Sequence, residues 1–255
     1  MATVLSDDDR RRLGATFDSV ADLYERARPG YAEDAISWLL PDATARVLDL
    51  GAGTGKLTAQ LVARELDVVA VEPSPAMRAQ LVARLSTVDA RAGTAENTGL
   101  PDADVDAVVI AAALHWFDRP AADHEIARVL RPGGVVGVFA NRRDSSVAWV
   151  RALNDVLGAR LAGLPRSPRS TDQARFDPAL FTPPERAEFP LHQTTDADGL
   201  ADVIATRSYV IDLPEHDRAV LLDEVRELAH THPDLAGKER FELPYVTVVA
   251  RSRRK

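Results

Sequence analysis

The segment Val47-Leu48-Asp49-Leu50-Gly51-Ala52-Gly53-Thr54-Gly55-Lys56 carries the strongest structural signal in this chain. Residues 47–50 are mostly apolar and predict a buried strand, and the three glycines after them predict a tight turn that opens a helix. Glycines at such a turn let the backbone approach a ligand closely, and the first N–H groups of the helix point at that ligand. The segment therefore predicts a binding crevice at the carboxyl end of a strand.

Short apolar runs alternate with helix-like stretches from residue 46 to residue 141. The runs that predict strands are residues 47–50, 68–71, 105–111 and 135–139. The stretches that predict helices are residues 57–66, 74–85 and 123–130, the second of which begins with the capping pair Ser74-Pro75. Apolar strands separated by helices favour a parallel sheet with helices on both of its faces.

Further elements are predicted on both sides of this region. A helix with one stripe of residues three and four apart ends at Pro29-Gly30. The stripe consists of Phe17, Val20, Ala21, Tyr24 and Arg28. After residue 141 the patterns predict a helix at 145–161, an exposed excursion at 163–184, a strand at 187–193 and helices at 196–206 and 214–229. A last strand at 245–250 and a solvated basic tail at 251–255 follow.

Composition narrows the class of protein. The chain has 255 residues, 45% of them hydrophobic and 27% charged, which suits one globular α/β domain. It has no cysteine, which excludes disulfides, thiolate nucleophiles and cysteine-bound zinc. The net charge of −8 argues against a nucleic-acid partner, and the apolar run 107–117 is too short to span a bilayer. With no signal-peptide pattern and no metal-ligand spacing, we expect a cytoplasmic protein without a metal or a membrane partner; the oligomeric state is left open.

A second acid defines the ligand of the predicted crevice. Glu72 ends the next predicted strand, 21 residues beyond Gly51, where a carboxylate can accept hydrogen bonds from both hydroxyls of a ribose. The dinucleotide fingerprint requires a sixth-position glycine, which is Lys56 here, and the phosphate P-loop spacing is absent. Asp49 would repel a pyrophosphate, whereas it suits a cationic ligand. The pattern indicates a nucleoside that carries positive charge.

Several other motifs follow in a fixed order and cover roughly residues 40–142. They are Val69-Ala70-Val71-Glu72-Pro73-Ser74, Gly93-Thr94-Ala95-Glu96, residues 106–117 and Leu130-Arg131-Pro132-Gly133-Gly134, preceded by a Y-x-x-x-R-P-G-Y segment at residues 24–31. With the glycine turn, this set resembles the class I S-adenosylmethionine-dependent methyltransferases, in particular the methyltransferase type 11-like family. In that family the methyl donor has a cationic sulfonium and a cationic amino group, which fits Asp49.

The resemblance implies an α/β fold, a Rossmann-like seven-stranded, mostly parallel sheet with an antiparallel last strand, helices on both faces and helical lid insertions. It also implies a single methyltransferase domain over residues 1–255. Its expected parts are an N-terminal helical lid at 1–41, a donor-binding half at 42–142, a substrate lid at 143–186 and 195–240, and closing strands at 187–193 and 243–251.

The same resemblance assigns roles to individual residues. Asp49 is expected at the methionine end of the donor, Glu72 at its ribose, and the loop around Ala95 and Glu96 at its adenine. Arg28 is expected near the donor carboxylate. The full set of expected donor contacts is Tyr24, Arg28, Asp49, Gly51, Ala52, Gly53, Gly55, Glu72, Pro73, Ala95, Glu96 and Ala111.

Substrate-facing residues are expected just beyond the predicted strands at 105–111 and 135–139. His115 is a candidate general base with Trp116 beside it, and its alternative roles are to shape the pocket or to pack in the core. Asn141 and Arg142, followed by Arg143, are candidates for holding an anionic group of the substrate, and their alternative is a solvated cluster.

We therefore predict methyl transfer from S-adenosylmethionine to an O, N or C atom of a small-molecule acceptor, with S-adenosylhomocysteine as product. The N/D-P-P-Y/F motif of adenine- and amide-nitrogen methyltransferases is absent, since Ala113-Leu114-His115-Trp116 stands in its place. Two alternatives stay open at this point. One is a nicotinamide-dependent oxidoreductase on a similar sheet, and the other is a non-catalytic protein that binds S-adenosylmethionine.

Overall fold

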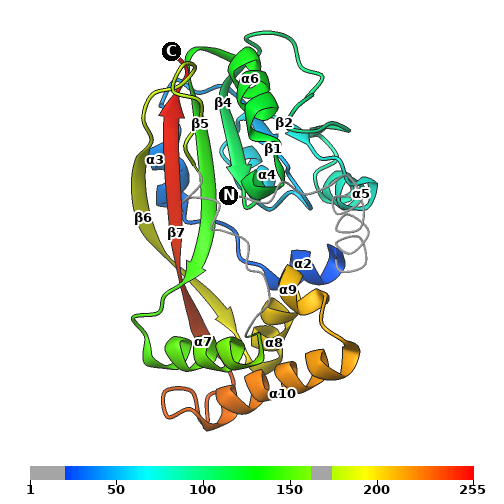
Figure 1. Ribbon diagram of the computed structural model, residues 1–255, viewed down its shortest axis with the longest axis vertical. Helices are drawn as coiled ribbons and strands as arrows, with labels where there is room; N and C mark the ends of the chain where they lie inside the picture. Colours follow the sequence, from blue (N-terminus) through cyan, green and yellow to red (C-terminus); the bar gives the residue numbers. More distant parts are fainter. Residues whose placement is uncertain (1–20, 162–173) are drawn as a thin grey trace.

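Figure 1 shows a computed structural model of the chain, in which residues 21–161 and 174–255 are described. Phe17 and Val20 of the predicted N-terminal helix lie outside these ranges, as does the first half of the predicted excursion. The described residues form a sheet flanked by helices and, at one end of its longest strands, a group of further helices. Within these ranges no helix is long and apolar enough to cross a membrane.

Seven strands form one sheet in the order β3-β2-β1-β4-β5-β7-β6. Strands β1 to β5 run parallel, and β7 lies antiparallel between β5 and β6. The bounds are β1 (Arg46–Leu50), β2 (Asp67–Val71), β3 (Asp89–Arg91), β4 (Val105–Ala111), β5 (Leu130–Arg143), β6 (Glu185–Thr195) and β7 (Phe241–Arg253). The predicted fold class is confirmed. The sequence patterns missed β3, because this short edge strand buries no apolar run.

Helices cover both faces of the sheet. α3 (Glu33–Leu39) and α4 (Lys56–Val62) pack on one face, where their buried side chains meet Val47. α6 (Arg119–Val129) packs on the other face, where it shares a core with Leu48. The alternation along β1 thus divides its apolar side chains between two cores. The remaining helices of this part are α2 (Ala21–Ala27) and α5 (Pro75–Arg84), and a 3-10 turn, η1 (Leu114–Trp116), follows β4.

Local capping sets the start of α5 as expected. The Ser74 side chain accepts a hydrogen bond of 3.2 Å from the backbone N–H of Met77, and Pro75 occupies the first helical position. Both features stabilise a helix N-terminus, because one free N–H is satisfied and proline needs none.

A helical cap lies at the far end of the three longest strands (Figure 1). It consists of α7 (Ala148–Arg160), α8 (Ala197–Ala205), α9 (Ser208–Ile211) and α10 (Glu215–Thr231). Its core includes the first residues of β7, among them Phe241 and Leu243, and Ala27 of α2 joins the same cluster. The cap is therefore anchored on β7 and reached by the N-terminal helix.

Two sequence expectations are wrong. The second half of the predicted exposed excursion contributes to the core, since Ala174, Phe176 and Phe181 pack with α6. The basic tail is not a free solvated end either: β7 continues to Arg253 and the Ser252 side chain is buried, although Arg253 and Lys255 are exposed. In both places tertiary pairing supplies partners that the local polarity of the sequence does not reveal.

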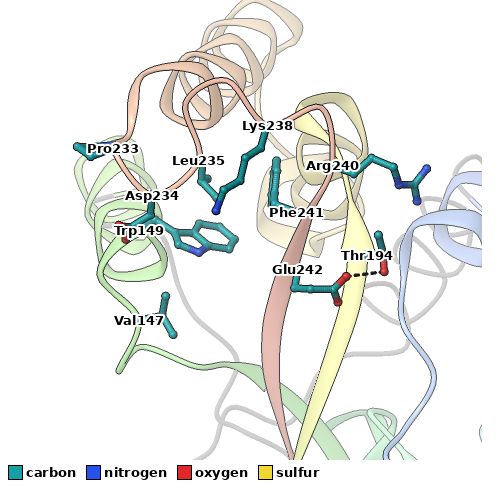
Figure 2. Close-up of a pocket in the computed structure, with 10 residues that line it drawn as sticks. All are labelled: Val147, Trp149, Thr194, Pro233, Asp234, Leu235, Lys238, Arg240, Phe241 and Glu242. Carbon is teal, nitrogen blue, oxygen red and sulfur yellow. Dashed lines mark hydrogen bonds between the residues drawn. The ribbon is translucent and has the colours of Figure 1, made fainter.

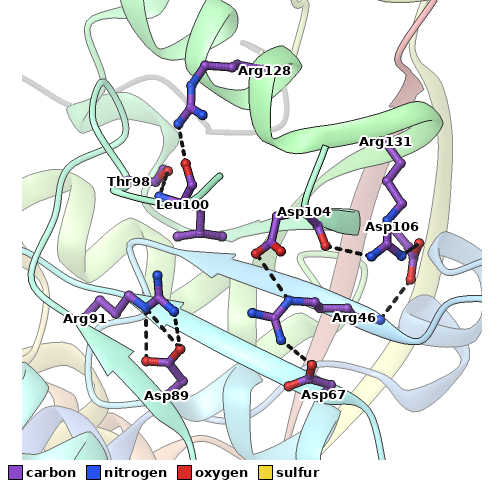
Figure 3. A network of polar contacts seen from close by, with 10 residues as sticks. All are labelled: Arg46, Asp67, Asp89, Arg91, Thr98, Leu100, Asp104, Asp106, Arg128 and Arg131. Atoms are coloured by element: carbon purple, nitrogen blue, oxygen red, sulfur yellow. Dashed lines mark hydrogen bonds and ion pairs between the residues drawn. The ribbon is translucent and has the colours of Figure 1, made fainter. Parts of the chain in front are cut away.

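The amino ends of the parallel strands are held by ion pairs (Figure 3). Arg46 at the start of β1 pairs with Asp67 and with Asp104, the latter at 3.3 Å. Arg131 pairs with Asp106, whose other oxygen accepts hydrogen bonds of 2.9 Å from the N–H groups of residues 45 and 46. At this edge Arg46, Arg128 and Arg131 each pair with at least one carboxylate, which marks the edge as structural. The carboxyl edge is where open α/β sheets bind their ligands.

Candidate active site

The glycine turn joins β1 to α4 with three residues in the left-handed region. The φ angles of Gly51, Gly53 and Gly55 are 72°, 58° and 86°. A Cβ on Gly51 would lie 2.7 Å from the Cβ of Ala113, so this position has no room for a side chain. A Cβ on Gly53 would meet no atom closer than the sulfur of Met77, at 3.9 Å. Protein packing therefore explains Gly51, whereas the space beside Gly53 is open, as a ligand site requires.

Asp49 lies at the base of this turn and is fully buried. Its Oδ2 accepts a hydrogen bond of 2.6 Å from the Thr58 hydroxyl, while its Oδ1 is buried and has no hydrogen-bond partner. Burial, together with the nearby charge of Glu72, raises the pKa of Asp49 to about 7. A buried carboxylate oxygen without a partner is costly, and a cationic N–H donor would satisfy it.

Glu72 ties the end of β2 to the glycine turn. One carboxylate oxygen accepts a hydrogen bond of 2.8 Å from the Gly53 N–H, and the other accepts one of 2.8 Å from the Ser74 N–H. Each ionised oxygen has a further lone pair, so the side chain retains acceptor capacity for ribose hydroxyls. Ala52 completes the connection, because its N–H donates to the Val71 carbonyl at 3.2 Å. Pro73, next to Glu72, is exposed.

The loop after β3 stands where an adenine-reading loop is expected. Ala95 is buried, and Thr94 and Asn97 exchange backbone hydrogen bonds around it. The Glu96 carboxylate accepts a hydrogen bond of 2.8 Å from the Asp118 N–H, at the start of α6. The Glu96 side chain thus supports the loop, and the backbone groups are left to contact a base.

The end of β4 leads into the candidate substrate residues. Ala112 follows the half-buried Ala111 and has a φ of 55°. This conformation is uncommon for a residue other than glycine, and such strained residues cluster at functional sites. His115 follows in the 3-10 turn, with its ring centroid 4.4 Å from that of Trp116. Burial lowers the pKa of His115 to about 4, so the imidazole is neutral at pH 7. Trp116 packs against the core that α6 shares with the sheet.

The N-terminal helix α2 is fastened over the glycine turn by Glu25, a residue that the sequence patterns did not single out. Its carboxylate accepts a hydrogen bond of 2.6 Å from the Thr54 hydroxyl and pairs with Arg84 at 2.6 Å and Lys56 at 3.2 Å. Glu25 has no pattern of its own in the sequence, because its partners are far along the chain.

The other end of α2 reaches the helical cap. The Arg28 guanidinium lies 5.2 Å from the centre of the Tyr24 ring. It donates hydrogen bonds to the side chain of Thr206 at 2.7 Å and to its carbonyl at 3.2 Å. Burial is the main reason why the pKa of Arg28 is lowered. Helix α2 therefore spans from the glycine turn to α8, as a lid over the carboxyl edge would.

The two predicted substrate residues on β5 are engaged in other contacts. The Asn141 side chain donates to the Gly30 carbonyl at 2.7 Å and accepts from the Thr247 hydroxyl at 2.7 Å. Arg142 pairs with Glu188 of β6. Their neighbour Arg143 instead donates to the side chain of Asn154 in α7, at 2.8 Å.

A pocket of about 740 Å³ opens at the other end of the helical cap (Figure 2). It lies between the start of α7, the residues after α10 and the start of β7, where the Thr194 hydroxyl donates to Glu242 at 2.6 Å. None of the sequence-predicted site residues lines it. The candidate site is therefore the crevice around Asp49 and Glu72 rather than this pocket.

Comparison with known proteins agrees with this geometry. A family model for the methyltransferase domain matches residues 48–138, which hold the glycine turn, Asp49 and Glu72. The uncharacterized methyltransferase Rv3342 of Mycobacterium tuberculosis is 47% identical over 243 residues, which cover 95% of this chain and 97% of that protein. The chain belongs to the S-adenosylmethionine-dependent methyltransferases.

More distant relatives of the methyltransferase share its full length or its fold. The uncharacterized methyltransferase-like protein C25B8.10 of Schizosaccharomyces pombe is 33% identical, over 90% of this chain and 91% of that protein. A solved structure from Anaeromyxobacter dehalogenans, assigned as a type II methyltransferase, has a TM-score of 0.70 at 27% identity and covers 89% of this chain and 97% of its own. The phospholethanolamine N-methyltransferase 2 of Haemonchus contortus, solved with S-adenosylhomocysteine, has the same fold, with a TM-score of 0.56 at 16% identity, over 99% of this chain and 60% of its own.

The residues of the methyltransferase fit its donor. The unpartnered Oδ1 of Asp49 suits the cationic amino group of the methionine moiety, and a nicotinamide pyrophosphate would meet the same carboxylate as a repulsive charge. Among residues 21–161 and 174–255, no group of three or more acids and histidines could hold a metal ion. The methyltransferase family and fold decide against the oxidoreductase alternative.

Proposed function

We propose that the methyltransferase transfers the methyl group of S-adenosylmethionine to a small-molecule acceptor held between the glycine turn and the helical cap. The observation that carries this proposal is the buried, unpartnered oxygen of Asp49 beside a glycine turn that Glu72 fastens. Helix α2 supports it, since Glu25 and Arg28 hold this helix at both ends over the carboxyl edge. A covered site of this kind favours a small acceptor over a polymer.

The proposed roles follow the contacts of each residue. Asp49 binds the donor amino group, Glu72 binds the ribose hydroxyls, and the backbone around Ala95 binds the adenine. Gly53 leaves room for the donor, and Ala111 forms the floor under its methionine moiety. Two of these roles use open features of the protein, namely the unpartnered Oδ1 of Asp49 and the space beside Gly53.

S-adenosylmethionine supplies an already activated methyl group on a sulfonium, so the protein contributes mainly position and the exclusion of water. The acceptor atom attacks in line with the bond that breaks. His115 is a weak base, because burial holds its pKa at about 4. We propose that His115 and Trp116 shape the acceptor pocket rather than remove a proton.

We also propose a cytoplasmic site of action. The absence of cysteine from the whole chain supports it, since the protein neither uses nor needs an oxidising compartment for its fold.

The test is a screen for release of S-adenosylhomocysteine across a library of metabolites. We expect turnover with at least one small molecule and a lower rate with Asp49→Asn at limiting donor; a reaction without protein is the control for uncatalysed release. Donor binding without turnover on any small molecule, together with methylation of a macromolecular fraction, would contradict the small-acceptor proposal. Quenching of tryptophan fluorescence by S-adenosylhomocysteine but not by NAD checks the donor itself.

A further inference from the structure

Three arginines from distant parts of the chain converge beside the cap. Arg28 follows α2, Arg143 ends β5, and Arg207 lies between α8 and α9. Arg28 hydrogen-bonds to Thr206, the residue before Arg207, and Arg143 lies opposite Tyr245 in the register of β5 and β7. The three guanidinium groups also act on one another electrostatically. We call this group the arginine cluster. Like charges brought together in the native state repel one another, so the fold maintains this arrangement at a cost.

In the part of the chain that the structure describes, no negative charge compensates the arginine cluster. The groups that act on Arg28 and Arg143 besides the other arginines are tyrosines, namely Tyr24, Tyr209 and Tyr245. Within residues 21–161 and 174–255, no acidic side chain is among these neighbours or forms an ion pair with the three arginines. Burial, followed by the charge of Arg207, lowers the pKa of Arg143 to about 10.

Several polar atoms of this region have no partner. Nη1 of Arg143, Nε of Arg207 and the hydroxyl of Tyr245 are buried and make no hydrogen bond within the described chain. Buried donors are nearly always satisfied in native proteins, so three of them around one cluster of positive charge point to a missing acceptor. The missing acceptor is anionic, because two of the three donors belong to guanidinium groups.

Other arginines of the protein behave differently. Arg46 and Arg131 at the amino edge of the sheet pair with carboxylates (Figure 3), as Arg226 on α10 does with Asp198 and Asp223. The lack of acids around the arginine cluster is therefore a local feature and not the general habit of this arginine-rich chain.

The arginine cluster adjoins the donor crevice. Tyr31, after α2, has both Asp49 and Arg28 among its electrostatic neighbours. Its ring packs on Phe139 of β5, with 5.4 Å between the ring centroids. A ligand that contacts the arginine cluster can thus extend toward Asp49, which is proposed to bind the donor.

We propose that Arg28, Arg143 and Arg207 bind an anionic group of the methyl acceptor, a carboxylate or a phosphate, which makes the acceptor an organic acid or a phosphate ester. This inference rests on the proposed function. The planar guanidinium is suited to it, since it forms paired hydrogen bonds with both anions. Tyr245 completes the site as a neutral donor. The methionine carboxylate of the donor has the same chemistry, and the experiment separates the two sources.

The first arm measures binding without turnover. The melting temperature of the full chain, loaded with S-adenosylhomocysteine, is followed with inorganic phosphate and with succinate, against chloride at equal ionic strength. We expect both anions to raise the melting temperature of the wild type, and Arg143→Gln and Arg207→Gln to abolish the rise. Without any anion, both variants melt above the wild type because repulsion is relieved. The control is Arg160→Gln, whose arginine pairs with Glu224 on the outside of the cap, and it keeps the wild-type response.

The second arm measures turnover on a library sorted into acids, their neutral amides and amines. We expect turnover only with the acids. In Arg143→Gln and Arg207→Gln the acceptor KM rises about 10- to 150-fold, which corresponds to the loss of one hydrogen bond to a charged group. Affinity for S-adenosylhomocysteine stays within about threefold of the wild type in both variants.

Three results overturn the inference. One is an equal response of the wild type to phosphate, succinate and chloride. Another is turnover on neutral acceptors with the two variants unchanged. The last is a loss of affinity for S-adenosylhomocysteine but not for 5′-methylthioadenosine, which lacks the amino-acid part, because the arginine cluster would then hold the donor carboxylate. Failure of the wild type to bind S-adenosylhomocysteine at all instead contradicts the proposed function, and the phosphate response still tests the arginine cluster.

Discussion

Thr58 donates a hydrogen bond of 2.6 Å to one carboxylate oxygen of Asp49 and leaves the other oxygen buried without a partner. The pair lies between β1 and the first turn of α4, where the fold would gain stability from an apolar residue. A buried carboxyl whose second oxygen is unused is a cost that a ligand can offset. This relationship therefore connects the stability of the protein to the binding of its donor.

The stability of the ligand-free protein falls as the pH rises through the titration of Asp49. The pKa of this carboxyl is about 7 in the folded protein, against an ordinary value of 3.8. The folded state therefore binds more protons between these values, and the contribution, roughly 4 kcal/mol at most, is present below pH 4 and lost by pH 7 to 8. We expect Asp49→Asn to remove this dependence and to melt above the wild type at pH 8. Melting curves from pH 4 to 8 measure it, and parallel profiles for the two proteins would sink the prediction.

Donor affinity follows the opposite trend with pH. The ionised form of Asp49 binds a cationic amino group, so affinity for S-adenosylhomocysteine rises as the pH increases through about 7. Asp49→Asn lowers the affinity for S-adenosylhomocysteine. It leaves the affinity for 5′-methylthioadenosine, which lacks the amino-acid part, unaffected. Calorimetry at several pH values measures the affinity for each of the two ligands. An equal loss of affinity for both would show that Asp49 does not contact the methionine end.

Glu72→Ala lowers the affinity for both S-adenosylhomocysteine and 5′-methylthioadenosine, because each carries the ribose. The loss of two charge-assisted hydrogen bonds costs about 1.5–3 kcal/mol each at most, and less where water replaces them. The variant also loses the acceptors for the N–H groups of Gly53 and Ser74, so its melting temperature falls. Glu224→Gln, on the surface of α10, is the control for a simple change of charge. Unchanged calorimetric affinity in Glu72→Ala would remove this residue from the site.

Substitutions at two glycines of the turn separate binding from folding. Gly53→Val abolishes donor binding in a protein that still folds, because its Cβ enters open space and the cost is mainly the positive φ, roughly 1–2 kcal/mol. Gly51→Ala destabilises the fold itself, since its Cβ would lie 2.7 Å from that of Ala113. Circular dichroism melting and calorimetry distinguish the two effects. A Gly53→Val protein that binds the donor normally places the crevice elsewhere.

His115→Asn lowers turnover by less than about tenfold and leaves donor affinity within a few-fold. The reason is that an imidazole with a pKa of about 4 is a weak base at neutral pH, and an activated sulfonium needs little help. The pH profile of turnover keeps its shape in the variant. A drop of about 10²–10⁴ with loss of a limb would identify His115 as a general base after all.

Much of the fold follows from short-range patterns. Residues 47–50 and 105–111 are apolar runs of strand length, and the observed strands begin and end within one residue of them. Ser74-Pro75 starts α5 as expected, since capping and a fixed φ act within one turn. The same holds for the glycine turn, Asp49 and Glu72, because a strand, a tight turn and a following strand with an acid at its end form one local unit. These local features are what predicted S-adenosylmethionine as the donor and the methyltransferase family.

The rest depends on contacts between distant residues. Nothing local marks Asp89–Arg91 as an edge strand, Phe181 as a core residue or residues 251–253 as the end of a buried strand. The sequence names Asn141 and Arg142 as readily as Arg143, and only the structure shows which of them already have partners. Local sequence determines which side chains share one face of a strand or helix. Whether a side chain has a hydrogen-bond or ion-pair partner depends on every residue that the fold brings near it. The arginine cluster, which draws on α2, β5 and the segment between α8 and α9, is therefore a property of the tertiary structure alone.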